Sequence, residues 1–194
     1  MSRRTVPCNE PGMNPRREYV LDLTSFLAPA AFTEDARFQL RAAMASDVNA
    51  LSELMIDAYQ GTIDYAGESL EDAMSELQAY LKGRCGGPPL LERSCLAFAG
   101  PTLAGACLPS DWDIRPSAFI PYIMTRAKWK NLGVAQQVLR TVLHGLREDG
   151  HREVRTIITI GNTPSEKVFA RMGFKEAPEP PPVLAGSDAT DRTR

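Results

Sequence analysis

The sequence predicts a single α/β domain built around a mixed β-sheet. Its 194 residues, 43% of them hydrophobic, suffice for one sizeable core, which favours one domain over two. Segments with strand-like alternation and segments with helical periodicity follow one another in the order strand, two helices, strand pair, strand, helix, strand, helix. This interleaving, without any internal repeat, is typical of one layered α/β domain.

The first half of the pattern begins with a strand and continues with two helices. Residues 38–42 alternate between apolar and polar side chains, as in a half-buried strand. Ser46 or Asp47 can cap a first helix, whose apolar residues recur every three or four positions over 48–58. Ser69 can cap a second helix, which ends at a break rich in glycine and proline. We expect the apolar face of this helix to comprise Leu70, Ala73, Met74, Leu77 and Leu81.

A hairpin and a further strand follow. The apolar runs 94–99 and 102–108 flank a Gly-Pro pair, which predicts the hairpin. The polar stretch 109–116 is expected to be a loop, and 118–125 the next strand. Pro121 cannot donate to a strand ladder, so it requires a strand start, an edge or a bulge.

The clearest helix covers 133–150, followed by a β-branched strand over 154–160. Thr163 and Glu166 then form a predicted capping box that opens a last helix, which ends at Gly173. On the long helix, the polar residues expected to face away from the core are Gln136, Gln137, Arg140, Thr141, His144, Arg147 and Glu148.

Shifts in composition set the predicted domain boundaries. We expect a partly mobile N-terminal extension over 1–37, a folded domain over 38–177, and a Pro-rich disordered tail over 178–194. Within the extension, residues 18–33 carry enough apolar side chains for either a strand or a short helix packed on the domain.

Composition excludes several classes of function. With 22 basic and 24 acidic side chains the formal charge is −2, which gives no basic excess for nucleic acid. No apolar run approaches the roughly 20 residues that span a bilayer, and no secretory signal is recognisable, so we expect a cytoplasmic protein without membrane contact. The four cysteines form no C-x-x-C pair and only two histidines are present, so we expect no metal site.

The segment most informative about chemistry is 122–135. A strand ends at Thr125, a short basic loop follows, and residues 130–135 open the long helix. A helix start exposes unpaired N–H groups and the positive end of the dipole, and Gly133 and Ala135 let an anion approach closely. The local pattern therefore predicts either a phosphate site or a merely structural helix start. It lacks the Lys-Ser/Thr of a P-loop and the G-x-G-x-x-G of a dinucleotide fold.

Two blocks together resemble the GNAT family of N-acetyltransferases. The first, 130–135, is similar to the family's coenzyme A signature, Gln/Arg-x-x-Gly-x-Gly/Ala, with Lys130 in place of Gln or Arg. The second, 162–174, has Asn before a helix that ends in Gly-Phe, as in the family's second signature. The resemblance extends from about residue 38 to 174. It implies a mixed, mostly antiparallel sheet flanked by helices, with acetyl-CoA as co-substrate and an amine as acceptor.

The resemblance also implies roles for individual residues. The strand residues Ile123, Met124 and Thr125 would bind the pantetheine arm through their backbone, as an added strand would. Asn162 would place the pantetheine, and Phe169 would lie beside the thioester. The pyrophosphate would bind at the helix start formed by Lys130, Asn131, Leu132, Gly133, Val134 and Ala135.

Phe169 departs from the family pattern. Many members have a tyrosine at this position, which can protonate the leaving thiolate. Phenylalanine has no hydroxyl group, so another group must supply that proton, or the thiolate leaves with help from water. This departure keeps open an alternative function, in which the chain binds acyl-CoA as a sensor or interaction domain with little turnover.

The resemblance places the acceptor wall on the first two helices and their link. The link, 59–68, contains Asp64 and Glu68, either of which can attract a cationic amine and relay its proton. Equally, Asp64 fits a turn residue and Glu68 merely precedes the helix cap. Tyr122 is a further candidate for the site or a packed aromatic.

The resemblance leaves one edge of the sheet and the oligomeric state open. The C-terminal segment is too short and too rich in proline for a full final hairpin, so either residues 19–27 or a partner subunit would fill that edge. Because members of the family are often dimers, a homodimer is a reasonable expectation.

Overall fold

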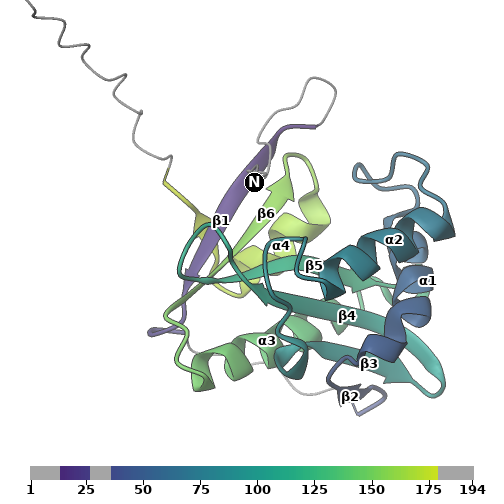
Figure 1. Cartoon of the computed structure of the whole chain (residues 1–194), viewed down its shortest axis with the longest axis horizontal. Coiled ribbons are helices and arrows are strands. Elements are labelled where there is room, and N and C mark those ends of the chain that lie inside the picture. Colours follow the sequence, from purple (N-terminus) through teal and green to yellow (C-terminus); the bar gives the residue numbers. More distant parts are fainter. Residues whose placement is uncertain (1–13, 27–35, 179–194) are drawn as a thin grey trace, which may run out of the picture.

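The computed structural model describes residues 14–26 and 36–178. In this part of the chain a seven-stranded sheet runs in the order β2-β3-β4-β5-β6-β1-β7 (Figure 1). The strands are β1 (Arg16–Asp22), β2 (Gln39–Arg41), β3 (Cys95–Ala99), β4 (Thr102–Asp111), β5 (Ala118–Thr125), β6 (Glu153–Thr159) and β7 (Lys175–Glu176). The helices are α1 (Val48–Tyr59), α2 (Leu70–Leu81), α3 (Val134–Glu148) and α4 (Thr163–Arg171). All strand pairs are antiparallel except β5 with β6, so the predicted fold class is confirmed.

Two hydrophobic cores lie on opposite faces of the sheet. One is formed with α1 and α2, which lie side by side against β4 and β5 (Figure 1). The other is formed with α3 and α4. Ile120 belongs to the α3–α4 core and Tyr122 to the α1–α2 core, although residues two apart in a regular strand share a face. The reason is a bulge, where Ile120 and Pro121 of β5 lie opposite the single residue Pro109 of β4. The predicted need of Pro121 for an irregular position is thus confirmed.

Strands β5 and β6 pair over a short distance and then diverge. Their parallel register comprises only Ala118 with Val154 and Phe119 with Arg155. One further link follows, where the Thr156 hydroxyl donates to the Ile120 carbonyl at 2.9 Å. Beyond this point the edge of β5 that faces β6 has no strand partner, which leaves its backbone groups available to a ligand.

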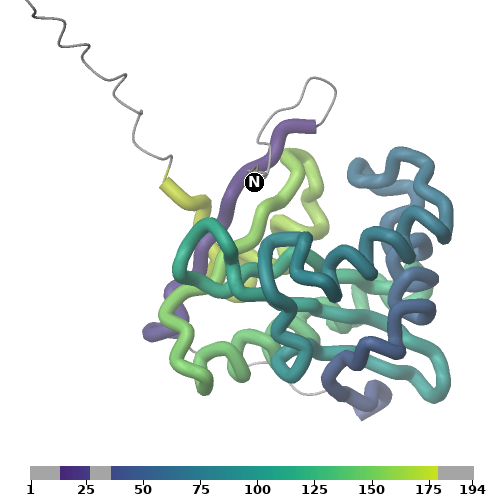
Figure 2. The backbone as a smooth tube through the Cα atoms, viewed as in Figure 1, coloured from purple at the N-terminus to yellow at the C-terminus, as the bar shows by residue number. Residues whose placement is uncertain are grey.

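The N-terminal strand is an integral part of the sheet. All seven residues of β1 pair antiparallel with β6, from Arg16 opposite Thr159 to Asp22 opposite Glu153. Figure 2 shows this purple segment running alongside the yellow-green β6, although the two are far apart in sequence. Of the two alternatives for this region the strand is correct, and it covers the edge that the short C-terminal segment leaves open. The sheet therefore begins before residue 38. The expectations of mobility for the start of the chain and of disorder for its tail concern mostly residues outside the described ranges.

Several local predictions require correction. Strand β4 continues to Asp111, into the stretch predicted as a loop, because these residues pair with the start of β5. On α2 the inner face consists of Ala73, Leu77 and Tyr80, whereas Leu70 is 47% exposed because it lies in the first turn, at the rim. Gln137, predicted to face solvent, is buried on α3. Its position borders a wide apolar stripe, which rotates it toward the core.

The caps of the helices also differ in detail. Ser69 caps α2 as predicted, and Asp72 completes the capping box. At α4 the capping residue is Asn162, one position before the predicted Thr163, and its side chain accepts from the Ser165 N–H. This places Pro164 within the first turn of α4, where its missing N–H is not needed.

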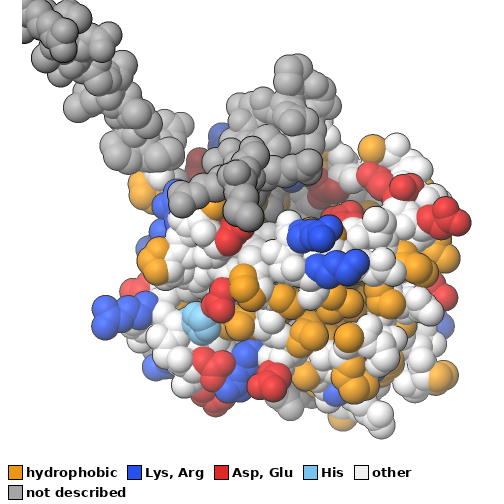
Figure 3. All heavy atoms as spheres, in the orientation of Figure 1, with side chains coloured by type: hydrophobic (Ala, Val, Ile, Leu, Met, Phe, Trp, Pro, Cys, Tyr) orange, Lys and Arg blue, Asp and Glu red, His pale blue; other side chains and the backbone are white. Residues whose placement is uncertain are grey.

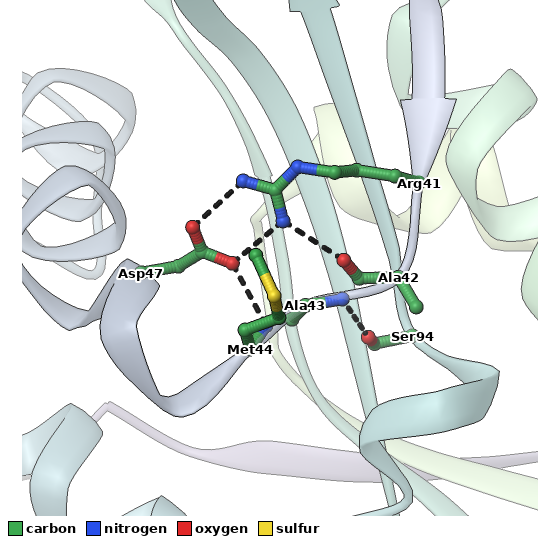
Figure 4. Close-up of polar contacts among 6 residues, drawn as sticks. All are labelled: Arg41, Ala42, Ala43, Met44, Asp47 and Ser94. Atoms are coloured by element: carbon green, nitrogen blue, oxygen red, sulfur yellow. Dashed lines mark hydrogen bonds and ion pairs between the residues drawn. The ribbon is translucent and has the colours of Figure 1, made fainter.

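Asp47 fixes the entry to α1 through an ion pair with β2 (Figure 4). Its carboxylate accepts two hydrogen bonds from the Arg41 guanidinium, each 2.7 Å long, and one from the Met44 N–H. Arg41 lies over the Phe98 ring, 4.7 Å from its centre. The hydrogen bonds from Arg41 lower the pKa of the Asp47 carboxyl against the opposing effect of its burial. Asp47 thus holds the N-terminal position of α1 without capping it by a side-chain bond.

Candidate active site

A cleft of about 360 Å³ lies between the α1–α2 side of the molecule and the diverging strands β5 and β6. Its acidic wall, as we call it, consists of Asp64, Glu68 and Glu76 from the α1–α2 link and α2. In Figure 3, acidic side chains gather where this link and the start of α2 lie. The far side carries Arg16 of β1 and Asn162 at the start of α4. Segments from both ends of the chain therefore meet in one space.

Asp64 is held in the cleft by Asn162. The Asn162 amide nitrogen donates to Oδ2 of Asp64, and the amide oxygen accepts from the Ser165 N–H at 3.2 Å. Both ends of the Asn162 side chain are thus engaged, one in capping α4 and one in orienting the half-buried carboxylate of Asp64. The other oxygen of Asp64 has no hydrogen-bond partner among the described residues and remains able to accept a proton or a hydrogen bond.

Glu68 lines the same cleft, but its carboxylate is engaged within its own loop. Oε2 accepts from the Ala66 N–H at 2.9 Å. The Tyr65 hydroxyl donates to the backbone carbonyl of Glu68 at 3.3 Å. These contacts tighten the turn that precedes α2, so Glu68 combines the structural role considered for it with a place in the acidic wall.

Glu76 is a member of the wall that sequence reasoning missed. The Tyr122 hydroxyl donates to its Oε1 at 2.9 Å, across the gap between β5 and α2. Helical periodicity gives a usable signal, because Glu76 lies three residues after Ala73 and next to Leu77, both on the buried face of α2. A polar residue at the margin of a buried face lies where the helix meets its neighbour, which here is the cleft.

In two tyrosines that line the cleft, the pKa of the hydroxyl group is raised strongly. Burial is the main cause that raises the pKa of Tyr122, and the nearby charge of Glu76 raises it further. Burial likewise raises the pKa of Tyr59, with additional upward contributions from Glu76 and Asp64 and a downward one from Arg16. Both phenols therefore stay protonated at neutral pH and act as hydrogen-bond donors rather than as acids that release a proton.

The unpaired edge of β5 forms the opposite margin of the cleft. Ile123 lines it, whereas the side chain of Met124 points into the α1–α2 core. Thr125 lies opposite Gly105 of β4, and its hydroxyl oxygen is buried without a hydrogen-bond partner. A buried hydroxyl without a partner is uncommon and indicates a position where a bound group or water supplies the bond.

The start of α3 lies just beyond this end of β5. Gly133 occupies the N-cap position with φ of 83°, and no side chain caps the helix. Asn131 also has positive φ, at 65°. A side chain added at Gly133 would meet nothing within 4 Å, so the first turn opens to solvent. On its inner side this turn packs tightly, because a Cβ at Gly105 would lie 2.5 Å from Cγ1 of Val134. The arrangement exposes the N–H groups of the first turn to an incoming anion.

The loop between β5 and α3 is fastened to the end of α1. The Lys130 ammonium donates to the Ala58 carbonyl at 2.8 Å. The Ala127 N–H donates to Oδ2 of Asp57 at 3.0 Å. Lys130, expected at the pyrophosphate, thus also satisfies a carbonyl at the C-terminus of α1, where a cation is favoured by the helix dipole.

Phe169 lines the cleft from α4 and is only 2% exposed. Its ring lies edge-on to Phe174, with the centroids 4.9 Å apart. It therefore forms a hydrophobic floor and offers no hydrogen bond to a leaving group.

Within residues 14–26 and 36–178, no three potential ligands among His, Cys, Asp and Glu come close enough to hold a metal ion. Nor does any helix in these ranges have the length and apolar character needed to cross a membrane.

Comparisons with known proteins agree on one fold. Residues 110–180 match the family model described as FR47-like protein. The GCN5-related N-acetyltransferase (GNAT) of Sphaerobacter thermophilus superposes with a TM-score of 0.64 at 19% identity, covering 84% of this chain and 48% of that one. This chain has the GNAT fold. The resemblance suggested by its two sequence blocks is confirmed at that level.

Two further solved structures cover most of both chains. A protein of Pyrococcus horikoshii OT3 is 17% identical with a TM-score of 0.62, covering 74% of this chain and 92% of that one. The aminoglycoside N-acetyltransferase AAC(6')-Iy, solved in complex with CoA, is 19% identical with a TM-score of 0.55, covering 76% and 93%. This chain spans about half the length of the Sphaerobacter protein. The search of curated proteins finds no match.

On this GNAT fold, the cleft brings together six residues that were site candidates from the sequence: Asp64, Glu68, Tyr122, Ile123, Asn162 and Phe169. Met124, Thr125 and residues 130–135 lie outside the cleft, along β5 and at the start of α3. Their assignment to the cofactor stays a prediction. Besides Glu76, the polar residues of the cleft for which the sequence predicted no role include Tyr59 and Arg16. No local sequence pattern identifies Arg16 as a site residue, because only the pairing of β1 with β6 brings it to the cleft.

Proposed function

We propose that the protein transfers an acetyl group from acetyl-CoA to a primary amine by direct attack of the amine on the thioester. The observation that carries this proposal is the joint position of Asp64 and Asn162, in one cleft with the unpaired edge of β5. A carboxylate held by a fixed amide next to an open strand edge offers a proton acceptor beside a place for an extended ligand.

Three features of the chain fit coenzyme A. The edge of β5 around Ile123 offers backbone groups at the spacing of a strand to the amides of the pantetheine arm. The uncapped start of α3 at Gly133 suits the pyrophosphate. The buried hydroxyl of Thr125, the last residue of β5, has no hydrogen-bond partner among the described protein atoms. The CoA complex of the aminoglycoside N-acetyltransferase of the same fold supports the assignment.

Asp64 is the residue that we assign to the proton of the acceptor amine. When bound, acetyl-CoA supplies an activated acyl carbon and a thiolate leaving group. The amine must be neutral to attack, so Asp64 accepts its proton directly or through one water, while Asn162 fixes the carboxylate. Glu68 and Glu76 add negative charge that attracts the cationic form of the amine to the cleft.

The transfer forms one C–N bond and breaks the C–S bond, and the departing thiolate takes up a proton. Phe169 cannot donate it. The hydroxyl of Tyr59 remains protonated because its pKa is raised, so it would stabilise developing negative charge by hydrogen bonding without giving up a proton, whereas the Tyr122 hydroxyl already donates to Glu76. Since a free thiol has a pKa of about 8.5, protonation by water suffices near neutral pH.

Release of free thiol tests the proposal. The protein is incubated with acetyl-CoA and a panel of small amines, amino acids and polyamines, and thiol formation is measured with and without acceptor. We expect acceptor-dependent thiol release for at least one class of amine. Tight binding of CoA without release for any amine would overturn the enzymatic reading.

Phe169 supports one alternative, a domain that binds acyl-CoA with little turnover. Thermal unfolding separates the cases, because a ligand that binds only the native state raises the melting temperature. Stabilisation by acetyl-CoA without thiol release favours the alternative, and no stabilisation at saturating acetyl-CoA contradicts both functions.

A further inference from the structure

Arg16 is a cation in the cleft that the acceptor-binding role of the acidic wall does not explain. It begins β1 opposite Thr159, and both residues line the cleft. Its neighbour Arg17 is not among the lining residues and forms an ion pair with Glu176 at 3.2 Å. Successive residues of a strand point to opposite faces, so only Arg16 of the two faces the acceptor space.

The position of Arg16 is fixed relative to the acidic wall. Asn14, two residues earlier, donates from its side-chain amide to the Ile63 carbonyl at 3.1 Å. Ile63 directly precedes Asp64, so this bond ties the start of β1 to the loop that carries the wall. The Pro15 carbonyl accepts from the Ile160 N–H at 2.8 Å and ties the same segment to the end of β6. These bonds fix the backbone at Arg16, while its exposed side chain lines the cleft.

The guanidinium groups of Arg155 and Arg115, which lie close to Glu18 of β1, have partners, whereas Arg16 has none among the described residues. Arg155 bonds with Glu153 and Glu18, and Arg115 pairs with Glu18. No hydrogen bond or ion pair joins the Arg16 side chain to any residue within 14–26 or 36–178. A guanidinium is always charged and presents a planar fork that matches a carboxylate.

The charges of opposite sign border the same space. The pKa of the Tyr59 hydroxyl reflects this arrangement. Burial raises this pKa most, the negative charges of Glu76 and Asp64 raise it further, and the positive charge of Arg16 lowers it. The residues that line the cleft thus include a negative wall and one positive group, all close enough to influence the Tyr59 hydroxyl. A simple amine or a polyamine would leave Arg16 without a counter-charge, whereas a zwitterionic acceptor would satisfy both sides.

We propose that the acceptor is a small amine that also carries a carboxylate, as a free amino acid does, and that Arg16 binds this carboxylate. This rests on the proposed acetyltransferase function. The amine then lies toward Asp64, and the carboxylate toward β1. The cleft has a volume of about 360 Å³, which lies in the lower part of the usual range for small-molecule sites. Arg16 is a specificity-determining residue in this arrangement and takes no part in proton transfer.

Matched acceptor pairs test the proposal. Thiol release from acetyl-CoA is measured with α-amino acids and with their carboxamides, for example glycine and glycinamide or leucine and leucinamide. The quantity compared is the ratio of kcat/KM for acid over carboxamide, in the wild type and in Arg16→Gln. Because each ratio uses the same two amines, differences in their intrinsic reactivity cancel between proteins. We expect the ratio to fall about 10- to 100-fold in Arg16→Gln, the loss typical of a charge-assisted hydrogen bond.

Arg17→Gln is the matched control, since it removes the same charge from the adjacent residue on the other face of β1. It should keep the wild-type ratio, and Arg16→Lys should retain part of it. An unchanged ratio in Arg16→Gln, or an equal loss in Arg17→Gln, would overturn the role of Arg16. Turnover of carboxamides alone would overturn the inference but leave the acetyltransferase function intact. Absence of thiol release with every acceptor would overturn the function itself, and with it the inference.

Discussion

The two sides of the cleft are built in different ways. The proposed cofactor side consists of backbone: the unpaired edge of β5 and, beyond the cleft, the uncapped start of α3 at Gly133. The proposed acceptor side consists of side chains from distant segments, with Arg16 on β1, Asp64 in the α1–α2 link and Glu76 on α2. A site built from backbone groups tolerates changes of side chain, provided the φ and ψ angles are kept. A side-chain site tolerates backbone variation but depends on each charged group.

This difference predicts opposite sensitivities. Removing one charge should affect the acceptor side strongly and the affinity for the cofactor little. Imposing strain on one backbone position should do the reverse. The following substitutions separate the two sides, in decreasing order of the expected effect.

Asp64→Asn should have the largest effect. It removes the proposed proton acceptor while leaving a side chain of the same shape beside Asn162. We expect kcat/KM for the amine to fall by about 10²- to 10⁴-fold, with little change in the affinity for acetyl-CoA. Steady-state kinetics and thermal shift with acetyl-CoA measure the two quantities.

Glu68→Gln is the comparison for Asp64→Asn, because the Glu68 carboxylate already accepts the Ala66 N–H. It should reduce kcat/KM less than Asp64→Asn does. A larger loss in Glu68→Gln would transfer the proton-accepting role to Glu68.

Gly133→Val should affect the cofactor side. The left-handed φ of 83° is unfavourable for valine by about 1–2 kcal/mol, and no neighbouring atom obstructs the side chain, so strain acts alone. We expect the strain to reshape the start of α3 and to weaken acetyl-CoA binding. Isothermal titration with acetyl-CoA, together with chemical denaturation, measures both effects.

Gly150→Val provides a control with the same strain at another place. Gly150 has φ of 84° and equally open surroundings, but it follows the C-terminus of α3. Both variants should lose similar stability, and only Gly133→Val should bind acetyl-CoA more weakly. Equal binding by the two variants would contradict the assignment of the pyrophosphate to the start of α3.

Asp47→Asn should have the smallest effect and touch neither side of the cleft. The hydrogen bonds from Arg41 make the Asp47 carboxyl more acidic in the folded than in the unfolded state. Its contribution is therefore complete above the unfolded pKa of about 3.9 and is lost as the pH falls through the lower folded pKa. Because the pair is partly exposed, we expect a loss of less than about 1 kcal/mol at neutral pH.

Denaturation of Asp47→Asn and wild type at several pH values checks this prediction. The difference in the free energy of unfolding between them should shrink as the pH falls below about 4. A difference that stays constant with pH would show that the Arg41 pair contributes nothing through its charge.

The regular elements of the fold were readable from local pattern. The alternation at 38–42, the cap at Ser69 and the stripe of α3 each depend on a few neighbouring residues, and each appears in the structure. Residues at the margins were less readable. Gln137 is buried and Leu70 exposed because the rotation of a helix against its neighbours is set by packing, which the local sequence does not encode.

The sequence by itself determined the α/β class and the start of α3 with its exposed N–H groups, because both depend on backbone geometry and periodicity within a few turns. Only the tertiary structure decided which charges meet. The pairing of β1 with β6 brings Arg16 to the cleft, the register of α2 against β5 joins Glu76 to Tyr122, and the cap of α4 turns Asn162 toward Asp64. These partners are separated by tens of residues in the chain, so no local pattern links them, and only the packing of complete elements brings them together.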